Sequence, residues 1–182
     1  MVKLRIERAL SSYDFRANPE APDSFSNNWK NNSRDWLILL DDKAELCRFR
    51  CQTVANYCFG KMAPGDSVEH GDTIAPGHFQ VRLFAEPRNF HGEIHEIINA
   101  TDLDGQRIDG HAMQITNDGY QTGRWLIHDR YSKKQGRDTN SAWSAGCFIL
   151  SSGDLEALNK MLHAYKFMPG EILNGEVVLD DW

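Results

Sequence analysis

The sequence contains no long apolar run and no excess of positive charge. Crossing a bilayer as a helix takes about 20 apolar residues, and no segment approaches that length. The first ten residues mix charged with apolar side chains, unlike the uninterrupted apolar core of a secretory signal. We therefore expect neither an export signal nor membrane insertion. The net charge of −6 offers no broad basic field, so nucleic acid is not an expected partner.

Cysteine is scarce, with four residues in 182. Cys47, Cys51 and Cys58 lie close together and Cys147 stands alone, a distribution unlike the disulfide framework of a small secreted protein. Zinc sites usually place cysteines as Cys-x-x-Cys or beside histidines, and neither arrangement occurs around the first three cysteines. We expect free thiols, no metal site and no cofactor.

The hydrophobic content of 41% is enough for one folded domain. Residues 11–33 are rich in Ser, Asn, Pro and Asp, so we predict an irregular N-terminal arm over residues 1–33 and a domain over residues 34–182. Apolar runs and period-two alternation predict strands, and apolar residues at helical spacing predict one amphipathic helix. The fold class expected is α+β and mainly β. The strands are expected at 35–40, 45–54, 79–84, 111–116, 124–128 and 175–179, with a turn at 117–119 and the helix at 155–165.

The segment from His128 to Cys147 carries the residue types needed for thiol acyl transfer. An imidazole can take the proton of a thiol, and a small residue such as Gly146 beside the sulfur leaves backbone N–H groups free to face an oxyanion. His128 is expected at the end of a strand and Cys147 at the start of another. The competing interpretation is a cysteine buried in the core, because Phe148-Ile-Leu150 follows it.

The motif Ser144-Ala-Gly-Cys147, with His128 nineteen residues upstream, resembles the signature of L,D-transpeptidase catalytic domains. The segment Thr73-Ile-Ala-Pro-Gly-His-Phe79-Gln-Val81 is similar to the Thr-Pro-x-Gly-x-Phe-x-Val segment of that family. The final helix and glycine-containing strand are similar as well. The resemblance covers roughly residues 34–179 and leaves the N-terminal region unexplained.

This resemblance implies a sandwich-like β fold with one amphipathic helix after the nucleophile strand, and an enzyme that acts on peptidoglycan stem peptides in the periplasm or cell wall. Cys147 would be the nucleophile and His128 its base. Gly146 and Cys147 would supply oxyanion N–H groups, and Ser144 would support the turn. The acyl-enzyme would form at the L-centre of a diamino acid with release of D-alanine. It would then pass to an amine or to water, a choice that the sequence leaves open.

Three neighbours of the pair are candidates for accessory roles. Asp129 follows the histidine, where the family usually has Gly or Ser, and its carboxylate is a candidate to orient the imidazole. Tyr131 and Trp143 are candidates to line a substrate groove, although such aromatics often serve packing alone. Ile149 stands where many family members have Arg or Asn.

Two other functions are compatible with the sequence. A noncatalytic cell-wall-binding or phage-associated module on the same fold would account for Ile149 and for the missing export signal. A zinc hydrolase would use His91, His95 and His111, although Gly92 disfavours a helix between the first two and the His-Glu-x-x-His order is absent. The oligomeric state is left open by the sequence.

Overall fold

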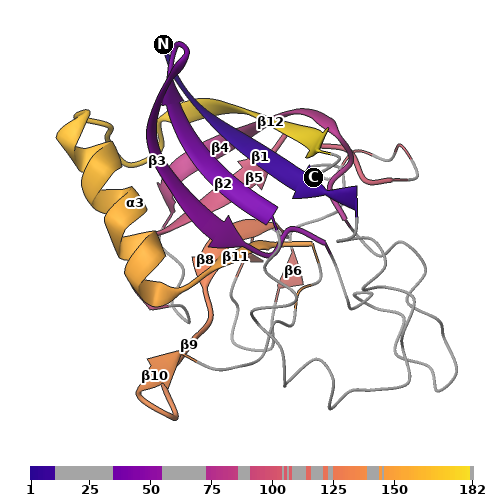
Figure 1. The fold of residues 1–182 in the computed structure, drawn as a ribbon. Coiled ribbons are helices and arrows are strands. Elements are labelled where there is room, and N and C mark those ends of the chain that lie inside the picture. Colours follow the sequence, from indigo (N-terminus) through magenta and orange to yellow (C-terminus); the bar gives the residue numbers. More distant parts are fainter. Residues whose placement is uncertain are drawn as a thin grey trace, which may run out of the picture.

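The computed structural model describes residues 1–10, 35–54, 73–85, 91–103, 105, 107, 114–115, 121–122, 125–138, 144 and 146–180. Its main feature is a single eight-stranded sheet that curls around a core, with helix α3 (Ser152–Ala164) against one side (Figure 1). Across the sheet the order is β11 (Phe148–Leu150), β8 (Leu126–Asp129), β5 (Ile94–Ile98), β4 (Gly77–Ala85), β12 (Ile172–Asp180), β1 (Val2–Ala9), β2 (Asp35–Asp41) and β3 (Ala44–Cys51).

Two short strand pairs lie outside the main sheet. Strand β6 (Gln114–Ile115) pairs antiparallel with β7 (Gln121–Thr122), and β9 (Tyr131–Ser132) pairs with β10 (Arg137–Asp138). The first pair is the arrangement that a hairpin turn at 117–119 would produce, but the turn itself lies outside the described residues.

The two edges of the main sheet meet, so that the sheet is nearly closed into a barrel. Gln52, just after β3, exchanges two backbone hydrogen bonds with Ile149 of β11: Gln52 N–H to Ile149 C=O at 3.0 Å and Ile149 N–H to Gln52 C=O at 2.9 Å. This contact joins strands at opposite ends of the sheet order and leaves little exposed edge. The mainly β fold is confirmed, as one curled sheet.

Helix α3 follows β11 directly and packs one face onto the core. The Ser151 hydroxyl caps its start by accepting a hydrogen bond from the Asp154 N–H at 3.1 Å. Leu155, Leu158 and Leu162 are buried in the same cluster as the inward-facing residues of the sheet. The amphipathic helix predicted after the Cys147 strand is confirmed, with its start moved slightly toward the N-terminus. Within the described residues, no helix is long and apolar enough to cross a membrane.

The N-terminal segment is a strand within the main sheet, which corrects the predicted arm over residues 1–33. Strand β1 pairs parallel with β12 and antiparallel with β2. Leu4 and Ile6 point into the core and are fully buried. Two ladders of hydrogen bonds and an apolar inner face hold this strand. Residues 11–33 of the predicted arm lie outside the described residues.

A buried polar network explains how a charged segment folds into the core. The Arg8 side chain, fully buried, donates to Thr53 Oγ1 at 2.8 Å and to the Ile74 carbonyl at 2.7 Å. The Thr53 hydroxyl donates in turn to the buried carboxylate of Asp35, which also accepts from the Ala9 N–H at 3.0 Å. Buried charges persist where hydrogen bonds and counter-charges replace water. The network ties the ends of β1, β2 and β3 together.

We expect Gly175→Ala to destabilise the fold, because Gly175 lies directly against a core ring. A Cβ built on Gly175 would lie 2.4 Å from two ring atoms of Phe79, and that ring is itself packed edge-on against Phe148 with ring centroids 5.6 Å apart. Overpacking of this kind costs about 1–3 kcal/mol of unfolding free energy, measured by urea denaturation.

Gly153 provides the matched control, because a Cβ there meets nothing within 4 Å. In helix α3, Gly153→Ala should raise the unfolding free energy by about 0.4–1 kcal/mol. Adding Phe79→Leu to Gly175→Ala should recover part of the loss. Equal effects of alanine at Gly175 and at Gly153 would contradict this explanation.

His95 links the sheet to helix α3 and is fully buried. Its Nδ1 accepts a hydrogen bond from the Phe84 N–H at 3.1 Å, and its Nε2 lies 2.8 Å from Asn159 Oδ1. The ring is therefore neutral with its proton on Nε2. Burial lowers the pKa of His95 to about 4, against the opposing hydrogen bond to Asn159.

The low pKa of His95 predicts that acid destabilises the fold. The folded pKa of about 4 lies below the ordinary value of 6.5, so the unfolded chain takes up the proton first as the pH falls. The neutral His95 ring makes its full contribution to the unfolding free energy above pH 6.5. As the pH falls from 6.5 to 4, the unfolding free energy decreases by roughly 3 kcal/mol in total. The unfolding free energy, measured by urea denaturation across this range, should depend less steeply on pH in His95→Gln than in wild type. An identical dependence would contradict the assignment.

Candidate active site

His128 lies in β8, and Cys147 immediately precedes the adjacent strand β11. Strands β8 and β11 are parallel, with His128 opposite Ile149 and Ile127 opposite Phe148. Paired residues share a face, and Cys147 is two residues before Ile149 along the chain. Phe148 and Ile127 point into the core. Diagonal neighbours in a sheet are about 7–8 Å apart, a distance that an imidazole can span.

A tight turn presents the Cys147 thiol at the entry to β11. Gly146 has a φ of +128°, in the region that favours glycine. The Ser144 hydroxyl accepts a hydrogen bond from the Gly146 N–H at 3.0 Å and donates one to the Cys147 carbonyl at 2.9 Å. Ser144 therefore supports the turn. The Gly146 N–H, expected to face an oxyanion, is already bonded to Ser144, which corrects that part of the prediction.

The Cys147 thiol is neutral at physiological pH. Burial raises the pKa of Cys147 to about 11, although backbone hydrogen bonds from Leu126 and from Cys147 itself favour the thiolate. A general base is therefore needed to ionise the sulfur during attack.

The tautomer of His128 suits that role. His128 Nδ1 lies 2.6 Å from the Asp129 carbonyl, and because a carbonyl only accepts, Nδ1 carries the proton and Nε2 carries the lone pair. Burial lowers the pKa of His128 below its ordinary value of 6.5, against the opposing bond to Asp129. The imidazole is thus neutral at pH 7, with a proton acceptor at Nε2.

The carboxylate of Asp129 does not orient His128, contrary to one of the roles considered from sequence. Since Asp129 alternates with His128 along β8, its side chain is on the opposite face. There it accepts from His91 Nδ1 at 3.0 Å and from the Tyr131 N–H at 3.2 Å. The Tyr131 ring stacks on His91 with centroids 4.0 Å apart. Asp129 and Tyr131 thus belong to a cluster with His91, and Trp143 lies outside the described residues.

The zinc alternative loses one of its ligands. Both ring nitrogens of His95 are hydrogen-bonded within the core, and His91 Nδ1 is bonded to Asp129 on the exposed side. His111 lies outside the described residues. Among residues that the structure describes, no three His, Cys, Asp or Glu side chains gather as a metal site would require.

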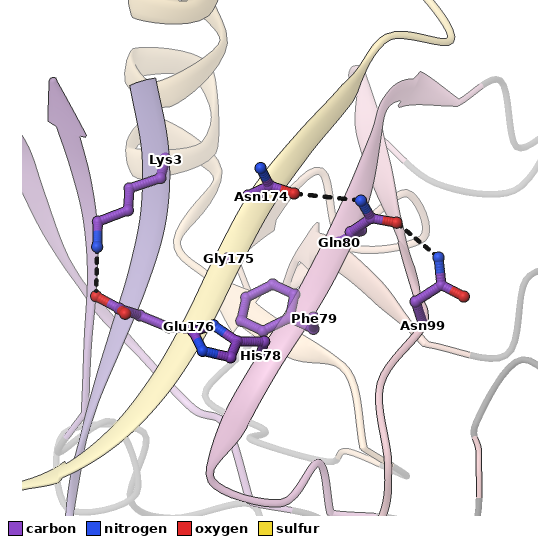
Figure 2. Close-up of a pocket in the computed structure, with 8 residues that line it drawn as sticks. All are labelled: Lys3, His78, Phe79, Gln80, Asn99, Asn174, Gly175 and Glu176. Atoms are coloured by element: carbon purple, nitrogen blue, oxygen red, sulfur yellow. Dashed lines mark hydrogen bonds and ion pairs between the residues drawn. The ribbon is translucent and has the colours of Figure 1, made fainter. Parts of the chain in front are cut away.

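Two pockets elsewhere on the molecule are separate from the Cys147 face. One, of about 470 Å³, lies beside His91 and helix α3. The other, of about 450 Å³, is shown in Figure 2. In it Gln80 Nε2 donates to Asn174 Oδ1 at 3.2 Å, and Asn99 Nδ2 donates to Gln80 Oε1 at 2.6 Å. It lies over β4 and β12, and β12 is four strands from β11 in either direction around the barrel.

Gln52 is a neighbour of the site that the sequence did not predict. Its backbone pairing with Ile149 brings it beside the Cys147 face. Nothing in the local pattern signals this, because the pairing depends on closure of the sheet between segments far apart in the chain. Ile149 is buried at this junction, and its burial explains why the position holds an apolar side chain.

Comparison with other proteins finds one clear similarity. No protein-family model matches the chain. An uncharacterized protein of Treponema pallidum (strain Nichols) is 53% identical over 175 residues, which span 96% of this chain and 78% of that protein.

Proposed function

We propose that this chain, which belongs to the same family as the uncharacterized Treponema pallidum protein, is a cysteine acyl-transfer enzyme of L,D-transpeptidase type. Its substrate would be a peptidoglycan stem peptide. The observation that supports the proposal is that His128 lies in β8 and Cys147 directly before its parallel neighbour β11, with the Nδ1 of His128 bonded to the Asp129 carbonyl. The Ser144-Ala-Gly-Cys147 motif, which resembles the signature of L,D-transpeptidase domains, also supports the proposal.

The first half-reaction follows from the protonation states of the two side chains. Nε2 of His128 takes the thiol proton as the sulfur of Cys147 attacks the carbonyl at the L-centre of the diamino acid. A tetrahedral oxyanion forms beside the turn that carries Cys147. The bond to D-alanine breaks as the His128 imidazolium gives its proton to the leaving amine. A thioester on Cys147 and free D-alanine result.

The second half-reaction returns the enzyme to its starting state. An amine of another stem peptide or a water molecule attacks the thioester, and His128 removes the proton of the attacking group. The bond to the Cys147 sulfur then breaks, and the sulfur takes the proton back from His128. The product is a cross-linked peptide when an amine attacked and a trimmed peptide when water attacked. Since a neutral thiol is the resting form, Cys147 should react slowly with small electrophiles free in solution.

The proposal is tested by incubating the protein with purified tetrapeptide muropeptides and measuring the products by mass. Loss of D-alanine alone would indicate carboxypeptidase action, and a cross-linked dimer would indicate transpeptidation. Exchange of a supplied D-amino acid for the terminal D-alanine would support the same acyl-enzyme. Muropeptides recovered unchanged under all these conditions would contradict the proposal and favour a noncatalytic module that binds the cell wall.

A further inference from the structure

We propose that Gln52 is a substrate-binding residue of the Cys147 site, with its side-chain oxygen forming a subsite for an amide N–H of the acyl-donor peptide. The inference rests on the proposed function for the identity of the donor. Its geometric basis is independent of the substrate, since it depends on where Gln52 lies and on what its side chain contacts.

Gln52 lies in one row with the candidate site. It is paired with Ile149 through two backbone hydrogen bonds, at 3.0 Å and 2.9 Å, and Ile149 is paired with His128 on its other side. Paired residues in a sheet point to the same face. The side chains of Gln52, Ile149 and His128 therefore form a row across three strands, and Cys147 lies two residues before Ile149.

The Gln52 side chain reaches along its own chain to Val54. Its Nε2 donates a hydrogen bond to the Val54 carbonyl at 3.2 Å. The bridge between Gln52 and Ile149 is antiparallel, so residues after Gln52 run beside residues before Ile149. Val54 is two residues after Gln52, and Cys147 is two residues before Ile149. The antiparallel direction thus places Val54, which holds the carboxamide, on the side of Gln52 where Cys147 lies.

Among the described residues, the oxygen of this carboxamide has no hydrogen-bond partner. Gln52 is 1% exposed, and Oε1 accepts a hydrogen bond from no donor among the residues that the structure describes. Buried polar atoms are nearly always paired, and an unpaired one calls for an explanation. The Gln52 Nε2 already donates to Val54, and Oε1 is the atom of the carboxamide left to be paired. Its complement is a donor, and a neutral amide N–H fits a buried position better than an ammonium group, which would be costly to desolvate.

The first test measures how Cys147 distinguishes an amide from an ester. Bromoacetamide and methyl bromoacetate alkylate a thiol by the same displacement of bromide, but only the amide carries N–H donors. We expect the ratio of their rates at Cys147 to exceed the ratio in the urea-unfolded chain by about tenfold. In Gln52→Met, which preserves side-chain length and removes the acceptor, the ratio should fall to the unfolded value.

Because a general loosening of the site would change both rates together, the ratio reports the acceptor and not the packing. Gln80→Met is the matched control, since Gln80 lies in the pocket of Figure 2, on β4 and three strands from β11. That variant should keep the wild-type ratio. An equal ratio in wild type and in Gln52→Met would overturn the subsite.

The second test uses muropeptides and separates this inference from the proposed function. Gln52→Met should lower kcat/KM by roughly tenfold to a hundredfold while a Cys147 acyl adduct still forms. Unchanged kcat/KM in this variant would overturn the subsite and leave the proposed function intact. If wild type does not turn over muropeptides but the alkylation ratio depends on Gln52, the peptidoglycan substrate is wrong and the subsite stands.

Discussion

Cys147→Ala is expected to abolish acyl transfer to and from muropeptides while leaving the fold intact. Without the sulfur no thioester can form, and removal of a nucleophile lowers kcat by on the order of 10⁴-fold or more. The thiol is half-buried and packs against the core, so alanine there should lower the unfolding free energy modestly while the domain still folds. Release of D-alanine, followed by mass, measures the activity, and circular dichroism measures the fold.

Cys47→Ala is the control for the loss of a thiol as such. Cys47 lies in β3, is half-buried and packs against the core, and burial raises its pKa. We expect this variant to be less stable than wild type and fully active. Undiminished turnover by Cys147→Ala, or an equal loss in Cys47→Ala without unfolding, would remove Cys147 from the mechanism.

His128→Gln is expected to lower kcat/KM by about 10²–10⁴-fold, the usual contribution of a positioned base. The pKa of Cys147 is about 11, so without the base only a small thiolate fraction reacts at neutral pH. Residual activity should therefore rise about tenfold for each pH unit up to that pKa.

The wild-type enzyme should behave differently with pH. Burial holds the pKa of His128 below 6.5, so the base is already neutral at pH 7 and activity should stay level from there upward. It should fall only as the pH drops through the lowered pKa and the imidazole becomes charged. His78→Gln, at an exposed position on β4, should keep the wild-type profile. A His128→Gln profile parallel to that of wild type would contradict the role of His128.

Patterns within single segments were sufficient to predict much of the fold. The apolar run at 35–40 and the segment 79–84 each fall within a strand, and the alternation in 45–54 corresponds to β3, which ends three residues earlier at Cys51. The helix was predicted from Leu155, Leu158, Met161, Leu162 and Tyr165. The structure buries the three leucines, packs Met161 against the core and leaves Tyr165 exposed. In each case one face of the element is apolar, and burial of that face requires no information from elsewhere in the chain.

Strands β1 and β5 were not predicted, and polar residues on their inner faces are the reason. In β1, Leu4 and Ile6 alternate correctly, but Arg8 follows them into the core through its bonds to Thr53 and Ile74. In β5, His95 occupies an inner position through its bonds to Phe84 and Asn159. Their partners are distant in the chain, so the pattern alone makes a buried polar residue look like an exposed one.

The candidate site was predicted in its central pair and not in its surroundings. His128, Cys147 and the turn residue Ser144 could be identified because they lie in one segment with a recognisable spacing. The bond from the Asp129 carbonyl to His128, the use of the Gly146 N–H by Ser144, and the position of Gln52 depend on sheet pairing and on turn geometry. A carboxylate next to a histidine in sequence suggested contact, but alternation along β8 places the two side chains on opposite faces.

The most direct test of the account is the mass of the intact protein shortly after mixing with a tetrapeptide muropeptide. The account predicts an adduct equal in mass to the muropeptide less D-alanine, located at Cys147 by peptide mapping and absent from Cys147→Ala. Product formation with no adduct at any time, or an adduct on a residue other than Cys147, would contradict it.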